Sequence, residues 1–426
     1  MEITLSHRPA RIATLVLATA ACFLAIAWIT RAYLATRQGL NPTLPNLHDA
    51  IKLDPSDGLY HLELGRLLQY DPESVDPQQS VAELKEAVRL SPYDPEAWRD
   101  LAMALQFEGR AEESLDCLRR ADTLAPRLPA LQWYVANALL LHGETPEAFR
   151  HFKVVLAGSA DYNAILFNTV WEASHDGSQI LSQVIPENVP VEFSYLGYLL
   201  HRSQFDDARA VWERIAASPE RFPPIQAAEY IDRLIGAHHP AEAWQVWDQL
   251  RSKGVIGPLA HPTDQNLVID GDFEQDGPYI GFGWRIVPAP GTYAGIDSTH
   301  HHSASHSFLV QFSGKNNIDY ENVFEFVRVS PSHSYRLSAY LRTEGITTDS
   351  GPRLRVRDAY DLSQVDKVSD DLEGSSGGWQ QVLLDFKTGP RTELIIVGLA
   401  RLPSRKLDNQ IAGRVWLDDV NLGPLP

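Results

Sequence analysis

The 426-residue sequence contains few cysteines and few positive charges. Its two cysteines, Cys22 and Cys117, are too few for a disulfide framework or a cysteine-rich zinc site. Lys and Arg number 37 against 55 Asp and Glu, which gives a formal net charge of -18. Binding to phosphate backbones requires a clustered excess of basic residues, so we expect no nucleic-acid partner.

Common catalytic signatures are also missing. The sequence has no phosphate-binding loop, no H-E-x-x-H zinc motif and no dinucleotide fingerprint. Glycoside hydrolysis needs only two carboxylates about 5 to 10 Å apart, which leaves a glycosidase or lyase as a minor alternative. We expect a protein that is not an enzyme.

One long apolar run lies near the N-terminus. Residues 12–29, IATLVLATAACFLAIAWI, carry no charge, and arginines flank them on both sides. This length crosses a bilayer as a helix. We expect an uncleaved transmembrane anchor over residues 12–30 after a short tail (1–11), because no A-x-A cleavage pattern follows Thr30. A lipoprotein signal ending at Cys22 is disfavoured, since Thr19 lies three residues earlier and the apolar run continues.

A linker (31–43) then leads to residues 44–254, which repeat with a period of about 34 residues. The clearest unit is residues 95–128. Its recurring positions are Trp98, Leu101, Ala102, Leu105, Gly109, Leu118, Ala121 and Pro126. Small residues suit close crossings of two antiparallel helices, and proline ends the second helix. Two more helix pairs are expected around Ala208 and Ala243, where the pattern is weaker.

With these positions, the region resembles tetratricopeptide repeat proteins. The resemblance implies an all-α superhelix whose concave face binds a protein partner. Tryptophans 98, 133, 212, 244 and 247 are expected to be packing residues rather than a binding groove. We expect His238 and His239, which precede Pro240, to be exposed to solvent.

After a Gly- and Pro-rich linker (255–264), the hydrophobic period changes from 3.6 to 2. In SYRLSAYLRT, Tyr335 and Leu337 share one face with Ala339 and Leu341. RLRVRD, QVLLDF and RVWLDDVNL alternate in the same way. Residues 265–426 are therefore predicted to form an all-β antiparallel sandwich.

The order of NLVIDGDFE, Gly283-Trp284, HHSASHSFLV, GGWQQVLLDF and VWLDDVNL resembles the calcium-containing jelly-roll carbohydrate-binding modules. That resemblance implies a structural Ca²⁺ held by Glu274 and Asp418, with Asp272 as a further ligand, since Ca²⁺ takes six to eight oxygens. The alternative is that these are ordinary polar residues at strand ends. The histidines at 300, 301, 302 and 306 are a weak transition-metal signal, because consecutive loop residues seldom converge on one ion.

Sugar binding requires aromatic faces bordered by hydrogen-bonding side chains. The candidates are Tyr320, Tyr340, Tyr360, Arg342, Arg355 and Arg357, together with Trp379. The arginines would suit an acidic polysaccharide, because guanidinium groups pair with carboxylates. The alternative is that the arginines only solvate the outer surface and that Trp379 belongs to the core.

Together, these features predict a multidomain protein: a single-pass inner (plasma) membrane protein with its bulk in the periplasm or otherwise outside the cytoplasm. We expect a bacterial envelope scaffold with a protein partner on the repeats and a polysaccharide on the sandwich, in assembly or export of exopolysaccharide or O-antigen. The alternative is a structural assembly factor whose sandwich binds protein rather than sugar.

Overall fold

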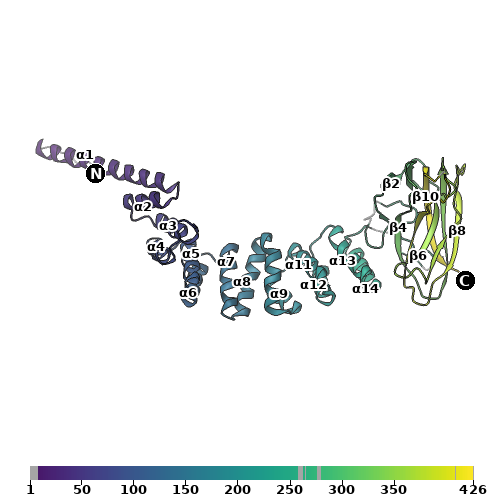
Figure 1. The fold of residues 1–426 in the computed structure, drawn as a ribbon, viewed down its shortest axis with the longest axis horizontal. Helices are drawn as coiled ribbons and strands as arrows, with labels where there is room; N and C mark the ends of the chain where they lie inside the picture. Colours follow the sequence, from purple (N-terminus) through teal and green to yellow (C-terminus); the bar gives the residue numbers. More distant parts are fainter. Residues whose placement is uncertain (1–7, 258–261, 264, 276–279, 408, 426) are drawn as a thin grey trace. The chain divides into compact units, whose positions relative to one another are not determined.

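The computed structural model describes residues 8–257, 262–263, 265–275, 280–407 and 409–425. They form two compact units, Met1–Tyr195 and Leu196–Pro426. The first unit is helical, and the second begins with helices and ends with two antiparallel β-sheets (Figure 1). The boundary between the units lies inside a helix, whereas the sequence suggested a division at residues 255–264.

The described residues contain fourteen α-helices before the strands. They are α1 (Arg8–Gly39), α2 (Leu44–Leu53), α3 (Gly58–Tyr70), α4 (Pro77–Leu90), α5 (Pro95–Phe107), α6 (Ala111–Leu124), α7 (Pro129–Leu141), α8 (Thr145–Gly158), α9 (Asn163–Ser174), α10 (Gly177–Gln183), α11 (Val189–His201), α12 (Phe205–Ala217), α13 (Ile225–Gly236) and α14 (Pro240–Ser252).

Helix α1 contains the predicted anchor. Its stretch from Arg11 to Gly39 contains an 18-residue segment with a mean hydropathy of 2.4. By length and composition the helix could cross a membrane, and a signal sequence has the same features. The helix also takes in most of the predicted linker 31–43, because residues 31–38 contain neither glycine nor proline. There Ala35 is buried, and Arg31 donates to the carbonyl of Leu53 over 3.0 Å.

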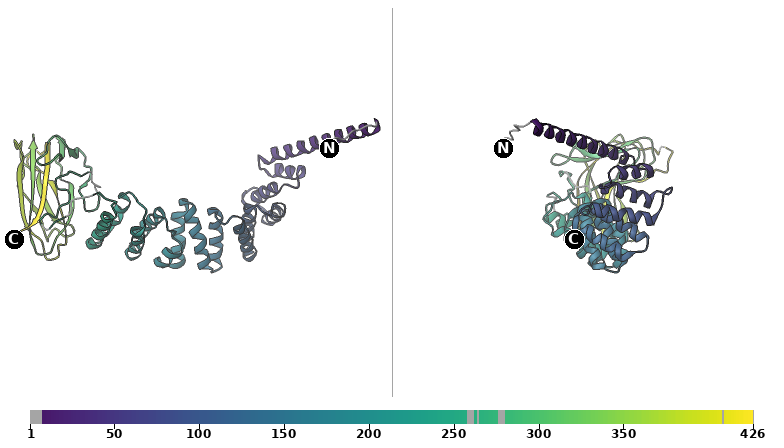
Figure 2. Two further views of the ribbon diagram at one scale, coloured as in Figure 1. Left: turned by 180° about the vertical axis from the view of Figure 1, so that it is seen from behind. Right: turned by 90° about the vertical axis from the view of Figure 1, so that its left-hand side faces the viewer.

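Hairpin α5–α6 corresponds to the clearest predicted repeat unit, residues 95–128. Hairpins α3–α4 and α7–α8 precede and follow it in the repeat region (Figure 2). Aspartates begin several of these helices. Asp57, Asp76 and Asp94 each accept a hydrogen bond from a backbone N–H in the first turn. These bonds satisfy donors that a helix end otherwise leaves unpaired, so the local sequence fixes where each helix starts.

The small residues of the repeat pattern lie where two helices cross closely. A Cβ at Gly65 would lie 2.5 Å from Cγ of Leu84 on the partner helix. Buried Ser80 and Ser114, at equivalent positions of successive repeats, each donate to a backbone carbonyl of the preceding helix over 2.8 Å. The close approach and these hydrogen bonds explain why the pattern recurs.

The strands are β1 (Arg285–Ile286), β2 (Thr292–Asp297), β3 (Ser307–Ser313), β4 (Tyr320–Arg328), β5 (Ser334–Glu344), β6 (Arg353–Asp358), β7 (Asp366–Val368), β8 (Gln380–Lys387), β9 (Leu394–Arg401) and β10 (Ala412–Pro424). They form two sheets. Sheet A has the order β1-β4-β9-β6-β7, and sheet B has the order β2-β3-β10-β5-β8. All described pairings are antiparallel, as the sequence predicted.

The core of the sandwich lies between the inner faces of the two sheets. On β5, the four residues predicted to share a face, Tyr335, Leu337, Ala339 and Leu341, are all buried. The segment before β1 runs beside the last strand, where Leu267 and Leu422 are joined by a backbone hydrogen bond of 2.8 Å. NLVIDGDFE is therefore a neighbour of VWLDDVNL.

In the second unit, the loop before β1 packs against α14. Phe282 is fully buried, with its ring 4.9 Å from the ring of Trp244 and 6.3 Å from that of Trp247. Arg285 then pairs with Asp232 of α13 over 2.5 Å. Hairpin α13–α14 and the sandwich thus share a buried aromatic contact.

Candidate ligand-binding sites

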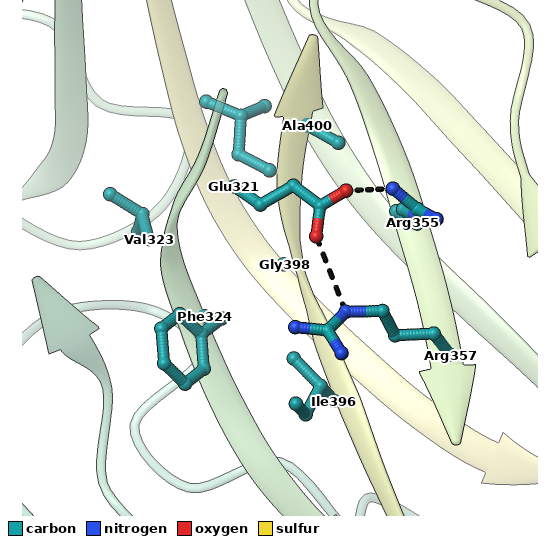
Figure 3. A pocket seen from close by; sticks show the side chains of 9 residues that line it. Glu321, Val323, Phe324, Arg355, Arg357, Ile396, Gly398 and Ala400 are labelled. Atoms are coloured by element: carbon teal, nitrogen blue, oxygen red, sulfur yellow. Dashed lines mark ion pairs between the residues drawn. The ribbon is translucent and has the colours of Figure 1, made fainter. Parts of the chain in front are cut away.

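A recess lies on the outer face of sheet A and spans β4, β9 and β6 (Figure 3). Glu321 of β4 reaches across β9 and forms ion pairs with two residues of β6, Arg355 and Arg357; its Oε2 is 3.2 Å from Nε of Arg357. The small residues Gly398 and Ala400 contribute from the central strand, β9. Two sequence-predicted arginines therefore lie together in one recess.

The backbone at Gly398 explains why a recess forms there. A Cβ at this position would lie 2.2 Å from the carbonyl oxygen of Val323, so β9 requires glycine next to β4. Phe324 provides an aromatic wall. The recess is shallow: its enclosed volume is about 10 Å³, which is room for about one water molecule. A ligand would therefore lie across this surface rather than inside a pocket.

The charges in the recess are balanced. Arg355 also pairs with Asp366 through two contacts of 2.9 Å, so two arginines face two carboxylates. Burial, together with the neighbouring charge of Arg355, lowers the pKa of Arg357. Because the cationic groups are paired within the protein, the recess offers no excess positive charge to an acidic polysaccharide, the ligand that the arginines alone suggested.

The six predicted glycan residues do not converge on one site. Arg355 and Arg357 lie in the recess, Tyr360 follows β6, Tyr340 and Arg342 lie on β5 in the other sheet, and Tyr320 is in the core. Tyr320 is only 1% exposed, and burial raises its pKa. It occupies an inward position of β4, so its ring contacts Phe312 instead of solvent.

A loop, Thr299 to His306, covers part of the outer face of sheet B. His302 stacks on Tyr340 with ring centroids 3.6 Å apart, and Trp379 meets the His302 ring at 69°. The guanidinium group of Arg342 lies 5.5 Å from the ring centroid of Trp416. Both predicted binding residues on β5 therefore already have an aromatic partner within the protein.

The two carboxylates predicted to hold calcium bind this loop. The fully buried Asp418 accepts hydrogen bonds from the backbone N–H groups of His302 and Ser303 through Oδ2. Glu274 accepts from the N–H groups of Ser305 and His306 through Oε1. Burial raises the pKa of Asp418; burial also raises that of Glu274, but the loop hydrogen bonds outweigh it and the net pKa is lowered.

This arrangement is a poor fit to calcium. The carboxylate oxygens of Glu274 and Asp418 face N–H donors, which occupy the side from which a cation would bind. Asp272 lies elsewhere, in the acidic recess described below. Among the described residues, no group of three or more His, Cys, Asp and Glu side chains is arranged to hold a metal ion. Calcium binding stays a prediction.

The loop histidines pair with carboxylates through Nδ1. His300 lies 3.2 Å from Asp297, His302 lies 2.5 Å from Asp419, and His306 lies 3.1 Å from Glu274. These pairs connect the loop to β2, to β10 and to the segment before β1. The histidines therefore contribute to fixing the loop on the sandwich.

A second, acidic recess beside β5 and β10 was missed by the sequence reasoning. It measures about 1010 Å³ including open solvent, and Asp270, Asp272, Asp419 and Asn421 are among its lining residues. Burial, with the added charge of Asp272, raises the pKa of Asp270 to about 7. Asp270 and Asp419 are far apart in the sequence and meet only because the first segment runs beside β10.

One stretch, GSSGG at 374–378, fits the letters of the G-x-S-x-G nucleophile motif. Ser376 lies in the loop before β8 and donates to the carbonyl of Gly378 over 2.6 Å. A nucleophile elbow requires a strand followed by a turn and a helix. The loop lacks that context.

In the first unit, charged residues connect successive repeats. Arg66 of α3 contacts Asp100 of α5 over 2.5 Å and Glu96 over 2.8 Å, and Arg99 lies over the ring of Tyr134 on α7. Burial lowers the pKa of Arg66, but the hydrogen bonds to Asp100 and Glu96 outweigh this and raise it. The first helix of each hairpin thus contributes to one polar strip.

No protein-family model and no curated protein matches the chain. Among solved structures, it is similar to the active domain of bacteriophage CBA120 tailspike protein 4 (13% identity, 38% of this chain and 21% of that chain, TM-score 0.26). It is also similar to Pseudomonas aeruginosa PilF (16%, 54% and 92%, 0.26) and to the CBM22-1 xylan-binding domain of Paenibacillus barcinonensis Xyn10C (12%, 39% and 97%, 0.25).

The chain spans only 21% of the length of the tailspike structure. It spans 66% and 29% of the lengths of two further matches, MamA and the CBM22-1-GH10 modules of Clostridium thermocellum xylanase 10B. At these TM-scores the similarities establish neither a family nor an activity.

Proposed function

We propose that the protein is a membrane-anchored scaffold of the bacterial envelope that binds a glycan through its jelly-roll sandwich and a protein through its tetratricopeptide-like repeats. Exopolysaccharide or O-antigen assembly or export would use both activities. The proposal assigns the chain no catalytic role.

The recess on sheet A is the main observation in support of glycan binding. It combines an aromatic wall, Phe324, with charged groups of β4 and β6 on a floor of small residues. Sugar recognition needs such a combination of an apolar surface and fixed hydrogen-bonding groups. Since the charges are balanced, we propose a neutral polysaccharide as the ligand.

A glycan array with the full chain in mild detergent tests this half. Arg357→Ala removes a donor from the recess and should weaken binding by roughly tenfold or more, because hydrogen bonds to charged groups are worth about 1.5–3 kcal/mol. The matched control is Arg336→Ala, which removes an exposed arginine paired with Asp385 on sheet B. Equal effects of the two substitutions, or no glycan bound at all, would exclude the recess as the glycan site.

The polar strip of the first unit supports the protein-binding half. Arg66 is partly exposed and lies among Glu63, Glu96 and Asp100, so the strip offers both charge signs to a partner. Capture of envelope proteins by the full chain should be reduced by Arg66→Ala. It should be unaffected by Arg89→Ala, which removes an exposed arginine paired with Glu86 within its own helix. If the wild type, Arg66→Ala and Arg89→Ala capture the same amount of partner, the polar strip is not the binding site.

With α1 as an anchor, both activities would lie at the inner (plasma) membrane. A reporter that is active only outside the cytoplasm, fused to the C-terminus, should be active. A signal from a cytoplasmic reporter would remove the envelope model.

One observation favours the alternative, an assembly factor whose sandwich binds protein. Phe282, from the loop before β1, is buried by α14, so the sandwich already makes a buried aromatic contact with helices. Retention of the protein partner after Arg66→Ala, together with an empty glycan array, would support it.

A further inference from the structure

Hairpin α13–α14 contacts the same sheet face that carries the recess. Strands β4 and β6 are both antiparallel to β9, so their C-terminal ends lie at the same end of sheet A. At that end, the guanidinium group of Arg328 lies 5.7 Å from the ring centroid of Trp244, and His238 stacks on Tyr360 with ring centroids 4.1 Å apart. The helices thus cover part of the face, and the recess begins beyond them.

The contacts between the hairpin and the sandwich differ in character. Phe282 is fully buried, and a Cβ at the neighbouring Gly281 would lie 2.6 Å from the ring of Trp247. By contrast, His238 is exposed and has a positive φ of 65°. The Phe282 contact therefore resembles a core, whereas the His238 contact is a surface stack.

The covered tyrosine has an unmet hydrogen-bonding need. The hydroxyl group of Tyr360 is buried and has no hydrogen-bond partner among the described residues. Burial raises the pKa of Tyr360 to about 12, so the hydroxyl keeps its proton at neutral pH. An unpaired buried hydroxyl is unfavourable, and a sugar hydroxyl could pair with it.

We propose that hairpin α13–α14 masks Tyr360 and that a bound glycan competes with His238 for this ring. The inference rests on the proposed glycan function and adds a regulation to the same site. Displacement of the His238 ring by the glycan would expose Tyr360 and extend the glycan surface beyond the recess.

Two neighbouring histidines provide the test and its control. His238→Asn removes the stacked ring, and asparagine tolerates positive φ. His239→Asn removes the adjacent ring, which lies near Phe205 of α12 instead of the sandwich. On the full chain in detergent, His238→Asn should tighten binding of the glycan found on the array by about 2- to 10-fold, the value of one aromatic stack. His239→Asn should leave the affinity unchanged.

Nitration of tyrosines by tetranitromethane, mapped by mass spectrometry, tests the masking without any glycan. Modification of Tyr360 should rise in His238→Asn and not in His239→Asn. In each sample, exposed Tyr293 gives the upper limit of tyrosine nitration and buried Tyr320 gives the lower limit. Unchanged nitration of Tyr360, or glycan affinity that falls or stays the same in His238→Asn, would overturn the inference. Absent glycan binding with increased nitration would instead refute the glycan function and leave the masking contact supported.

Discussion

Replacing Glu325 by glutamine should stabilise the second unit at neutral pH. Glu325 lies on β4 and is 1% exposed; its Oε1 accepts the N–H of Ile269, and its Oε2 has no hydrogen-bond partner among the described residues. Burial, with a smaller effect from the charge of Asp270, raises the pKa of Glu325 well above its ordinary value of 4.5. The folded protein therefore keeps this carboxyl protonated when the unfolded chain has ionised it.

The direction in which stability changes with pH follows from proton binding to Glu325. A raised folded pKa gives stability that is fully present below the unfolded pKa and is lost as the pH rises toward the folded pKa. Each pH unit above 4.5 costs about 1.4 kcal/mol, so a carboxyl still protonated at pH 7 costs at most about 3 kcal/mol. Glutamine keeps the acceptor for Ile269 and does not ionise, so it should recover much of this energy.

Thermal unfolding of the full chain between pH 4.5 and pH 8 measures the effect. Above pH 6, the transition of the second unit should rise by up to about 6–12 °C in Glu325→Gln, with little change at pH 4.5. Asp270 still titrates near pH 7, so the pH dependence should shrink by about one proton rather than vanish. A variant that melts below the wild type at pH 7, or with the same pH dependence, would refute the reasoning.

Three further outcomes are expected. Phe282→Ala should destabilise the second unit by about 3–5 kcal/mol, seen as a lower denaturant midpoint, because the fully buried ring leaves a cavity between Trp244 and Trp247; no change would show that the contact is not formed in solution. Asp418→Asn should lower the melting temperature equally with calcium and with chelator, since N–H groups occupy its carboxylate; a loss confined to calcium-containing buffer would restore the metal site. Asp94→Ala should cost the first unit about 1 kcal/mol in urea unfolding through loss of the bond to the N–H of Glu96, and an unchanged midpoint would contradict the capping role.

The fold was predictable where its signals are local. The repeat positions recur because each hairpin buries the same small residues, as at Gly65 and Ala102. The strand segments alternate because one face is buried, as on β5. Helices α9 and α10 and strand β9 were not anticipated: α9 and α10 depart from the repeat pattern, and β9 is buried almost continuously, so its sequence does not alternate.

The sites were harder to predict. Alternating hydrophobicity shows that a side chain points out of the sandwich, but it does not show to which of the two sheets its strand belongs. Arg342 and Arg355 both occupy outward positions, yet β5 and β6 belong to different sheets. Glu274 and Asp418 each accept hydrogen bonds from N–H groups of a loop that folds over β10, and nothing in the sequence indicated these partners. Such partners depend on long-range packing that no single segment encodes.

The position of the unit boundary bears on how the protein should be divided. A cut at the linker before residue 265 follows the change in hydrophobic period, but it separates Phe282 from Trp244 and Trp247. The isolated sandwich would then expose an aromatic loop beside sheet A, and the isolated helices would expose two tryptophans. Either surface could bind partners nonspecifically, because large apolar patches promote association. The same cut would also separate His238 from Tyr360. A glycan affinity measured on the isolated sandwich would therefore describe a sheet face without the His238 contact, which the whole protein has.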